Sequence, residues 1–347
     1  MQGTKKMIIK NNKVIILLSA VLTFLVLLFI TSIVNTDRPH KKNTVESALL
    51  NPKYNLSRIQ IQYQDSGFLE LINTGSFWGA KTPMPEKNVE KYLDKDPVTD
   101  YYFIADQKTV TDFIELSQSI TQLNKIADSN SLKNNPEKSF ANYGLDEKHA
   151  AVISYYDTEN NCVSKIYFGA LNQTLDQIFI RTDKQLAVYS MDSKIADFLD
   201  LRIDFWTDKN MIPEVILNHS NFNQLQNCTY GFSSILSASM PEMKNSGKKF
   251  YDKFPSLRFS KFADNYSFFN LYPDSLLIRV SDGNGTHYTI GISKTTTDDG
   301  DCYVYGLHIT PSIVFSEQEK NFIKNLNCHY YMSEWTYNSI VKLLLEE

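Results

Sequence analysis

The sequence predicts an α+β protein: an N-terminal transmembrane helix followed by two related units of antiparallel sheet with packed helices. Three observations support this fold class. The 347-residue chain opens with a long uncharged run, and two later stretches repeat one order of strands and a closing helix. The 20 tyrosines and 21 phenylalanines supply large rings for buried cores, which excludes a disordered or collagen-like chain.

The uncharged run, residues 14–34, is 21 residues long, about the length that a helix needs to cross the hydrocarbon core. A cleaved signal peptide is the alternative, but its apolar core is typically about 7–15 residues long and ends at a small-residue site. The run here is longer, residues 31–35 form a poor cleavage site, and no cysteine follows directly for a lipid anchor. We therefore expect an uncleaved anchor, with membrane lipid as its partner.

The charges beside this run predict its orientation. Residues 1–13 form a leader with four lysines and no acid, and three basic residues follow the run. Together with the free amino terminus, this modest bias favours a cytoplasmic leader. We expect a single-pass protein of the cell membrane whose remaining chain is periplasmic or extracellular. Without the leader lysines, the formal net charge of −4 becomes −8 for residues 14–347, which disfavours a nucleic-acid partner.

Residues 35–55 are polar and unpatterned, and we interpret them as a stalk. The first α+β unit, residues 56–212, opens with a hairpin of residues 59–63 and 68–71 that leads to Trp78. Loops are expected over residues 80–100 and 127–142. Between these loops, Asp106 is placed to cap a helix, whose apolar residues Val110, Phe113, Ile114, Ile120 and Leu123 recur at spacings of three and four.

Four strands and a short helix complete the first unit. The strands are expected over residues 151–156, 163–169, 177–181 and 186–191, and the helix over residues 195–199. We expect Trp78 to pack between the long helix and the hairpin, because the apolar stripe of that helix must be buried against something.

The second α+β unit, residues 213–347, repeats this order. Its strands are expected over residues 275–281, 287–292, 302–309 and 329–332, and its helix over residues 333–345. Residue-level matches place Ile153 opposite Ile278, Phe168 opposite Ile290, and Tyr189 opposite Tyr331. An insertion over residues 311–327 contains one extra helix, whose capping box is formed by Ser316 and Glu319.

The first unit resembles the bacterial family known as domain of unknown function 4340. The resemblance covers residues 57–215 well and rests on Trp78, on the turn Tyr143-Gly144-Leu145-Asp146, on residues 165–169, 178–181 and 187–189, and on a closing helix over residues 195–202. Glu147 and Lys148 stand where the family usually has a proline, and the link over residues 80–105 is longer than usual. The resemblance implies one N-terminal anchor, an extracytoplasmic α+β body, no known catalytic residues, and frequent company with ABC-type export or gliding-type transporter components.

No catalytic, cofactor-binding or metal-ligating motif is predicted. Four cysteines, Cys162, Cys228, Cys302 and Cys328, allow three fully paired connectivities or four buried thiols, and the sequence does not choose. Two acidic stretches, residues 282–285 and 298–301, lack the spacing of a calcium or phosphate loop and are expected to be hairpin turns. We expect a non-catalytic interaction or accessory module with an envelope or transporter protein as its partner; the alternatives are an envelope hydrolase and a ligand-sensing domain.

Overall fold

The computed structural model describes residues 50–345 apart from residues 65–66, 86–98, 121–122, 133–134, 220–226, 233–249, 251, 264–274 and 298–299. The predicted leader, the predicted transmembrane helix over residues 14–34 and most of the predicted stalk lie outside these described residues. Within them, no helix is both long and apolar enough to cross a membrane. Residues 45–347 form one compact unit, which contains both sheets.

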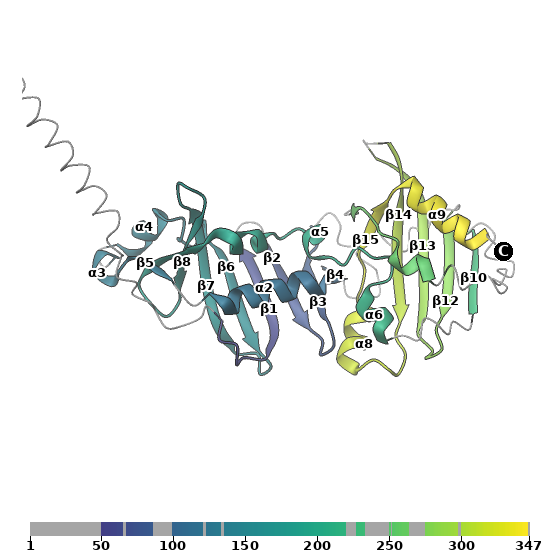
Figure 1. Cartoon of the computed structure of the whole chain (residues 1–347), viewed down its shortest axis with the longest axis horizontal. Coiled ribbons are helices and arrows are strands. Elements are labelled where there is room, and N and C mark those ends of the chain that lie inside the picture. Colours follow the sequence, from purple (N-terminus) through teal and green to yellow (C-terminus); the bar gives the residue numbers. More distant parts are fainter. Residues whose placement is uncertain are drawn as a thin grey trace, which may run out of the picture. The chain divides into compact units, whose positions relative to one another are not determined.

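The first sheet has nine strands, all joined to their neighbours in antiparallel fashion (Figure 1). In spatial order they are β4 (Asp100–Ile104), β3 (Trp78–Pro83), β2 (Gly67–Asn73), β1 (Leu56–Tyr63), β6 (Ala151–Asp157), β7 (Cys162–Leu171), β8 (Gln177–Thr182), β9 (Val188–Asp192) and β5 (Asn124–Ala127). The predicted hairpin and the four later strands are therefore confirmed. Strands β4 and β5 were not expected, because each is only four or five residues long.

A helical layer covers one face of this sheet. It contains α2 (Gln107–Ser119), the 3₁₀ helix η2 (Ser193–Leu199) and the short helix α5 (Ile203–Trp206). Asp106 caps α2, as predicted, by accepting a hydrogen bond from the backbone N–H of Lys108. The helix ends at Ser119, so Leu123 is not part of its stripe; it is buried in the loop before β5.

Trp206, rather than Trp78, is the buried tryptophan of this layer. Trp206 is fully buried and contacts the rings of Phe113 and Phe198, while its Nε1 donates a hydrogen bond of 2.6 Å to the carbonyl of Asp200. Trp78 lies on the helix-covered face but is only half-buried at the margin of the core. Its main chain pairs with the side-chain amide of Gln107 at 2.8 and 2.9 Å. Trp78 therefore packs against the core on the helix side of the hairpin, as expected, but only at its margin, and Trp206 fills the buried position under α2.

Two short helices stand where a loop was expected, over residues 127–142. They are α3 (Ser129–Leu132) and α4 (Pro136–Ala141). Asn135 caps α4 by accepting from the N–H of Lys138, and Pro136 occupies the first turn, where its missing N–H costs nothing. Only Leu132 and Phe140 are buried in these helices. Because most of the other residues are polar, the sequence shows no helical repeat of apolar residues here, and the helices were not predicted.

The second sheet has six strands, again antiparallel throughout. Its order is β10 (Asn227–Phe232), β12 (Leu276–Ser281), β13 (His287–Thr297), β14 (Gly300–Thr310), β15 (His329–Met332) and β11 (Lys261–Phe262). The described helices of this part of the chain are α6 (Glu214–His219), the 3₁₀ turn η5 (Phe254–Ser256), α8 (Glu317–Lys324) and α9 (Glu334–Leu345). The predicted extra helix is α8, and the capping box of Ser316 and Glu319 is present.

Six strands of the first sheet follow the same spatial order as the whole second sheet. The order β1-β6-β7-β8-β9-β5 corresponds to β10-β12-β13-β14-β15-β11. The registers also give a residue-level comparison: Ile153 pairs with Ile166, and Ile278 pairs with Ile290. If Ile153 and Ile278 are equivalent, Ile290 therefore corresponds to Ile166 and not to Phe168, so the match predicted for β7 is displaced by two residues.

The elements that each sheet has in addition to the six shared strands contact each other. Helix α8, inserted between β14 and β15, packs on β3 and β4, which belong to the part of the first sheet without a counterpart. The Phe322 ring lies 6.1 Å from the ring of Phe77 and 5.7 Å from that of Tyr102. A Cβ at Gly79 would lie 2.1 Å from the tip of the Phe322 ring, so this approach requires glycine. Asn327 completes the contact, because its side chain accepts from the N–H of Tyr102 at 2.7 Å.

Candidate functional site

The turn Tyr143-Gly144-Leu145-Asp146 and the strand segments that carry the family resemblance lie together at the β8–β9 end of the first sheet, whereas Trp78 is on β3. The turn around Gly144 crosses β7, and the N–H of Ala170 donates to the carbonyl of Tyr143 at 2.8 Å. Gly144 has φ +66°, and a Cβ on Gly169 would lie 2.2 Å from the Tyr143 carbonyl oxygen. Both glycines are needed because main chain passes directly over main chain.

A small separate core fixes this turn to the sheet. Leu132, Phe140, Leu145 and Val188 form it, and each is nearly fully buried. Partly buried rings pack around it, including Tyr143 against Phe179 at 5.1 Å. The motif residues of the sequence therefore have a first role that is structural: they attach α3, α4 and the turn to strands β7, β8 and β9.

Arg181 is held by this core on three sides. Its guanidinium carbon lies 3.6 Å from the centroid of Tyr167 and 4.7 Å from that of Phe140, and its Nε donates to the carbonyl of Leu145 at 2.9 Å. One of its five N–H groups is thus used, and the two aromatic contacts fix the plane of the guanidinium. Arg181 forms no ion pair with any carboxylate of the described residues.

Lys165 lies beside this arginine. In the sheet Tyr167 is directly opposite Arg181, and Lys165 is two residues along β7, so the two cations are diagonal neighbours on one face. The ammonium of Lys165 lies 5.3 Å from the Tyr167 ring, and the hydrogen bond with the Tyr167 side chain raises the pKa of Lys165. Like Arg181, Lys165 has no ion pair with a carboxylate in the described part of the chain.

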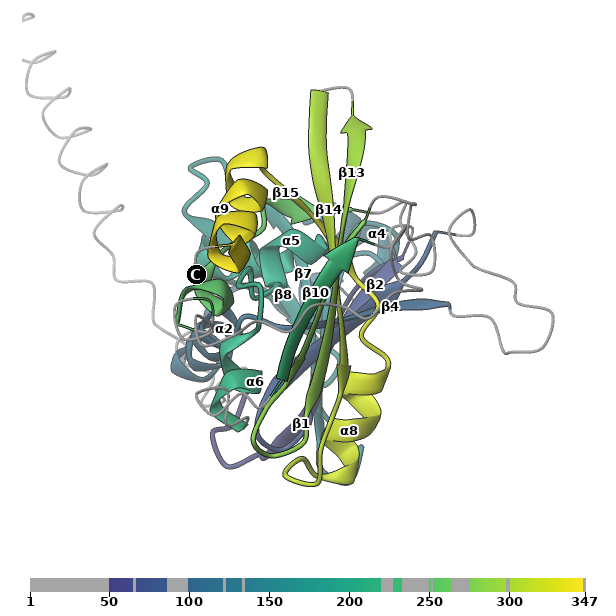
Figure 2. The ribbon, with the colours of Figure 1, turned by 90° about the vertical axis from the view of Figure 1, so that its right-hand side faces the viewer.

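The two cations lie on the face of the sheet that is opposite to α2, which we call the open face. One row of cross-strand neighbours on this face consists of Lys81, Glu70, Gln60, Ser154 and Lys165, on β3, β2, β1, β6 and β7. Glu70 is only 6% exposed and pairs with Lys81 at 3.3 Å and with Arg58 at 3.0 Å. This side of the sheet is opposite to α2, and Figure 2 shows α4 and α8 on the side away from α2 and α9. In this row Gln60, Lys81 and Lys165 are partly exposed, whereas Glu70 and Ser154 are buried.

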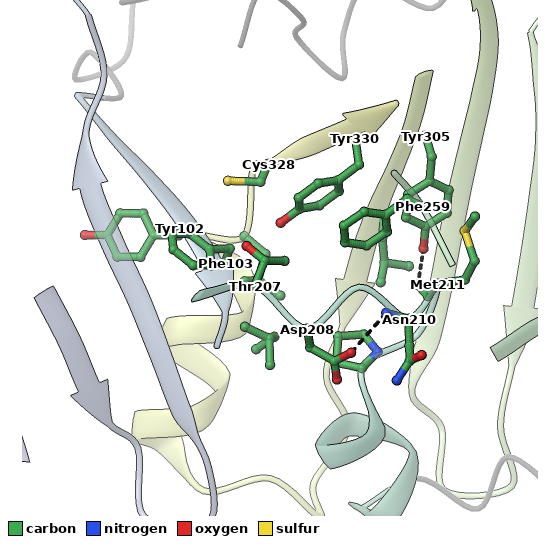
Figure 3. A pocket seen from close by; sticks show the side chains of 14 residues that line it. Tyr102, Phe103, Thr207, Asp208, Asn210, Met211, Phe259, Tyr305, Cys328 and Tyr330 are labelled. Carbon is green, nitrogen blue, oxygen red and sulfur yellow. Dashed lines mark hydrogen bonds between the residues drawn. The ribbon is translucent and has the colours of Figure 1, made fainter. Parts of the chain in front are cut away.

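A second candidate site is a small cavity where the first sheet meets the second. Its lining comes from β4, residues 207–213, β14 and β15 (Figure 3). The cavity has a volume of about 40 Å³, which is room for roughly three water molecules. Ligand pockets typically measure about 300–1,000 Å³, so this cavity does not hold an organic substrate in the present conformation.

The polar groups of this cavity serve the fold. The carboxylate of Asp208 accepts hydrogen bonds from the N–H groups of Asn210 at 3.0 Å and of Glu214, the first residue of α6, at 3.1 Å. Burial raises the pKa of Asp208. The hydroxyl of Tyr305 donates to the carbonyl of Met211. Burial also raises the pKa of the Cys328 thiol, so this cysteine stays protonated and is a poor nucleophile. The polar groups around this cavity therefore hold packed segments of the chain together.

The other candidates from the sequence are the four cysteines and the two acidic stretches. Cys162, Cys302 and Cys328 are free thiols, while the side chain of Cys228 lies outside the described residues. Residues 282–286 connect β12 to β13, so this acidic stretch is a hairpin turn, as predicted. In the second stretch, Gly300 and Asp301 belong to β14, where Gly300 pairs with Thr297, and residues 298–299 lie outside the described residues. The described residues contain no group of three or more histidine, cysteine or acidic side chains that would suit a metal ion.

Comparison with known proteins identifies the family of this region. No curated protein and no solved structure significantly matches the chain. Residues 98–233 match the family described as domain of unknown function (DUF4340). The match begins after Trp78 and extends beyond residue 215, so it is displaced toward the C-terminus from the predicted coverage, but it includes the turn, Lys165 and Arg181. Residues 98–233 therefore match the DUF4340 family, as the motifs predicted.

Proposed function

We propose that this chain is a single-pass, membrane-anchored extracytoplasmic protein whose body binds another envelope protein and acts as a non-catalytic accessory module. The anchor is the uncharged run over residues 14–34, and the four lysines before it favour a cytoplasmic N-terminus. Anchoring confines the body to the neighbourhood of the membrane, where weak contacts with other membrane proteins suffice because their effective concentration is high.

The observation that carries this proposal is the open face. Helices bury the opposite face of the sheet, while this one keeps half-buried cations and aromatic rings between α4 and α8. Arginine and tyrosine are enriched in protein interfaces, since both combine a large contact area with directed hydrogen bonds. A transporter subunit of the ABC export type is the partner class that the family resemblance implies.

Photo-crosslinking in cells tests the proposed interaction. A benzophenone amino acid replaces Gln60 in the middle of the open face, and the matched control replaces Asn338, an exposed amide residue on α9. Illumination of intact cells should yield a discrete adduct with a membrane protein from position 60 and none from position 338. The proposal fails if neither position gives an adduct, or if both give the same diffuse set of abundant proteins.

The membrane topology is tested separately. Protease added to intact spheroplasts should remove the residues beyond the anchor and leave a short fragment that contains the leader. Complete protection of the body would contradict the proposed orientation.

We also propose that the two sheets are related units, which divide near residues 212–213. The support is the common order of six strands, because chance resemblance between two antiparallel meanders does not require the outer strands to match. Both β5 and β11 precede the meander in sequence, yet each pairs beside its last strand. An experimental structure in which β11 pairs elsewhere would remove this support.

A further inference from the structure

The open face also indicates the chemistry of its partner. This step depends on the proposed function, and it starts from the charges of the strands between β2 and β8. On the open face these strands carry three cations, Arg58, Lys165 and Arg181, against one carboxylate, Glu70. Glu70 is already shared by Arg58 and Lys81. The positive charge that lacks a carboxylate partner is therefore concentrated at Lys165 and Arg181.

We infer that Lys165 and Arg181 form a carboxylate-binding site, and that its occupant is an acidic peptide segment of the partner protein. A guanidinium offers paired N–H groups in a plane, which matches the two oxygens of a carboxylate. The rings of Tyr167 and Phe140 and the carbonyl of Leu145 hold the guanidinium of Arg181 in place before any ligand binds. A pre-positioned side chain loses little rotamer entropy on binding, so the contact gains affinity.

Lys165 supplies the second positive charge for the same ligand. It is a diagonal neighbour of Arg181 across the two strands, and the Cβ atoms of such a pair typically lie somewhat less than about 7–8 Å apart. Side chains on one face of an extended peptide repeat about every 6.6–6.8 Å, so acidic residues at alternate positions match the separation between Lys165 and Arg181. An acidic strand or loop therefore fits the pair better than one isolated anion.

A protein partner is favoured over an anionic bilayer because the body as a whole is negatively charged. Residues 14–347 carry a formal net charge of −8, which repels a negatively charged membrane surface. The cations are also recessed between α4 and the sheet: Arg181 is half-buried, with aromatic rings near it on two sides. A side chain from a peptide reaches such a position more readily than a headgroup embedded in a bilayer.

The second sheet provides an internal comparison. When Ile166 is equivalent to Ile290, the position of Lys165 is occupied by Thr289 and that of Tyr167 by Gly291. Arg279, on β12, is an exposed cation of that sheet and lies over no aromatic ring of the described residues. It is therefore a suitable control for nonspecific attraction of an acidic ligand.

Binding of labelled hexaglutamate to the purified full-length chain in detergent tests the inference, with hexaglutamine as the neutral probe. We expect salt-sensitive binding of hexaglutamate only. Lys165→Gln and Arg181→Gln should each weaken it about tenfold, as loss of a close charge contact does. Arg181→Lys should weaken it less, because the charge remains while the paired N–H groups are lost. Arg279→Gln should bind like the wild type.

Several outcomes would overturn the inference. Wild-type affinity in Lys165→Gln, whose side chain is not part of the small core, would do so even if Arg181→Gln failed to fold. Equal weakening by Arg279→Gln would mean nonspecific attraction. Binding of vesicles rich in anionic phosphatidylglycerol that depends on Lys165 and Arg181 would assign the site to lipid headgroups. A crosslinked partner at Gln60 without hexaglutamate binding would retain the proposed function and reject the carboxylate site alone.

Discussion

The two sheets share a strand order but are completed by different elements. The first sheet adds β2, β3, β4 and α2 between β1 and β5, whereas the second inserts α8 between β14 and β15. Their closing helices also differ: η2 is a 3₁₀ helix of 7 residues, and α9 is an α-helix of 12. Because α8 packs on β3, the additions that distinguish the sheets also hold them together. The shared strands form the scaffold, and the contacts between sheets depend on what was added.

The largest expected effect is the difference in the free energy of unfolding between substitutions of tryptophans in the two helical layers. Trp206 is fully buried in the first layer, whereas Trp335, on α9, is 73% exposed. Trp206→Ala should lower the free energy of unfolding by about 3–5 kcal/mol, since it opens a cavity beside Phe113 and Phe198. Trp335→Ala should change it by less than about 0.5 kcal/mol, and half-buried Trp78→Ala should lie between them. Chemical denaturation of the three variants measures the order.

A reciprocal exchange tests why the first sheet needs glycine in β7. By register, Gly169 corresponds to Ser293, whose hydroxyl contacts that of Ser275 at 2.6 Å. Gly169→Ser should destabilise by about 1–3 kcal/mol, because its Cβ meets the carbonyl of Tyr143 and neither main chain can easily move. Ser293→Gly should cost only about 1 kcal/mol, from strand entropy and one lost hydrogen bond. Equal effects in thermal unfolding would mean that the two positions are not differently constrained.

The contact between sheets can be broken at Gly79. Gly79→Ala should destabilise by about 1–3 kcal/mol, because its Cβ collides with the Phe322 ring and that ring is confined by Phe77 and Tyr102. Phe322→Leu in the same chain should relieve part of this cost by removing the ring tip. A double-mutant cycle measured by denaturation gives the coupling. Additive effects would show that the two side chains do not interact.

The smallest expected effect depends on pH and concerns Glu319. Its burial acts to raise the pKa, but hydrogen bonds from Ser76 and Ser316 outweigh this and hold the pKa below its usual value of 4.5. A lowered pKa in the folded state contributes stability above the unfolded pKa, and this stability is lost as pH falls through the folded pKa. Glu319→Gln should therefore destabilise at pH 7 by about 0.5–2 kcal/mol, as loss of a cap does, and by less in acid.

Thermal midpoints between about pH 3 and pH 7 measure this difference, a range that spans the usual carboxyl titration. Glu317→Gln is the matched control, because Glu317 is on the same helix but pairs only with Lys320 at an exposed position. A constant difference between Glu319→Gln and the wild type at all pH values would show that the carboxylate charge is not responsible.

Local sequence was sufficient for elements with strong periodicity or caps. Asp106 and the capping box of Ser316 and Glu319 mark helices because they satisfy the free N–H groups of the first turn within a few residues. Short elements such as β4, β5 and α3 escaped prediction, because the partners that stabilise them lie far away in sequence. For the same reason the three tryptophans could not be ranked by burial from the sequence.

The sequence by itself determined the mixed α+β class, the two meanders, the turns and the family motifs, since each depends on the pattern or spacing of nearby residues. Only the tertiary structure decided that Trp206 fills the first helical layer, that α8 contacts Gly79, and that Lys165 and Arg181 lie on one open face beside Tyr167. Those relations depend on which side of a strand faces a neighbour and on the register between strands. A one-residue change of register reverses the face, and no local pattern specifies the partner across the sheet.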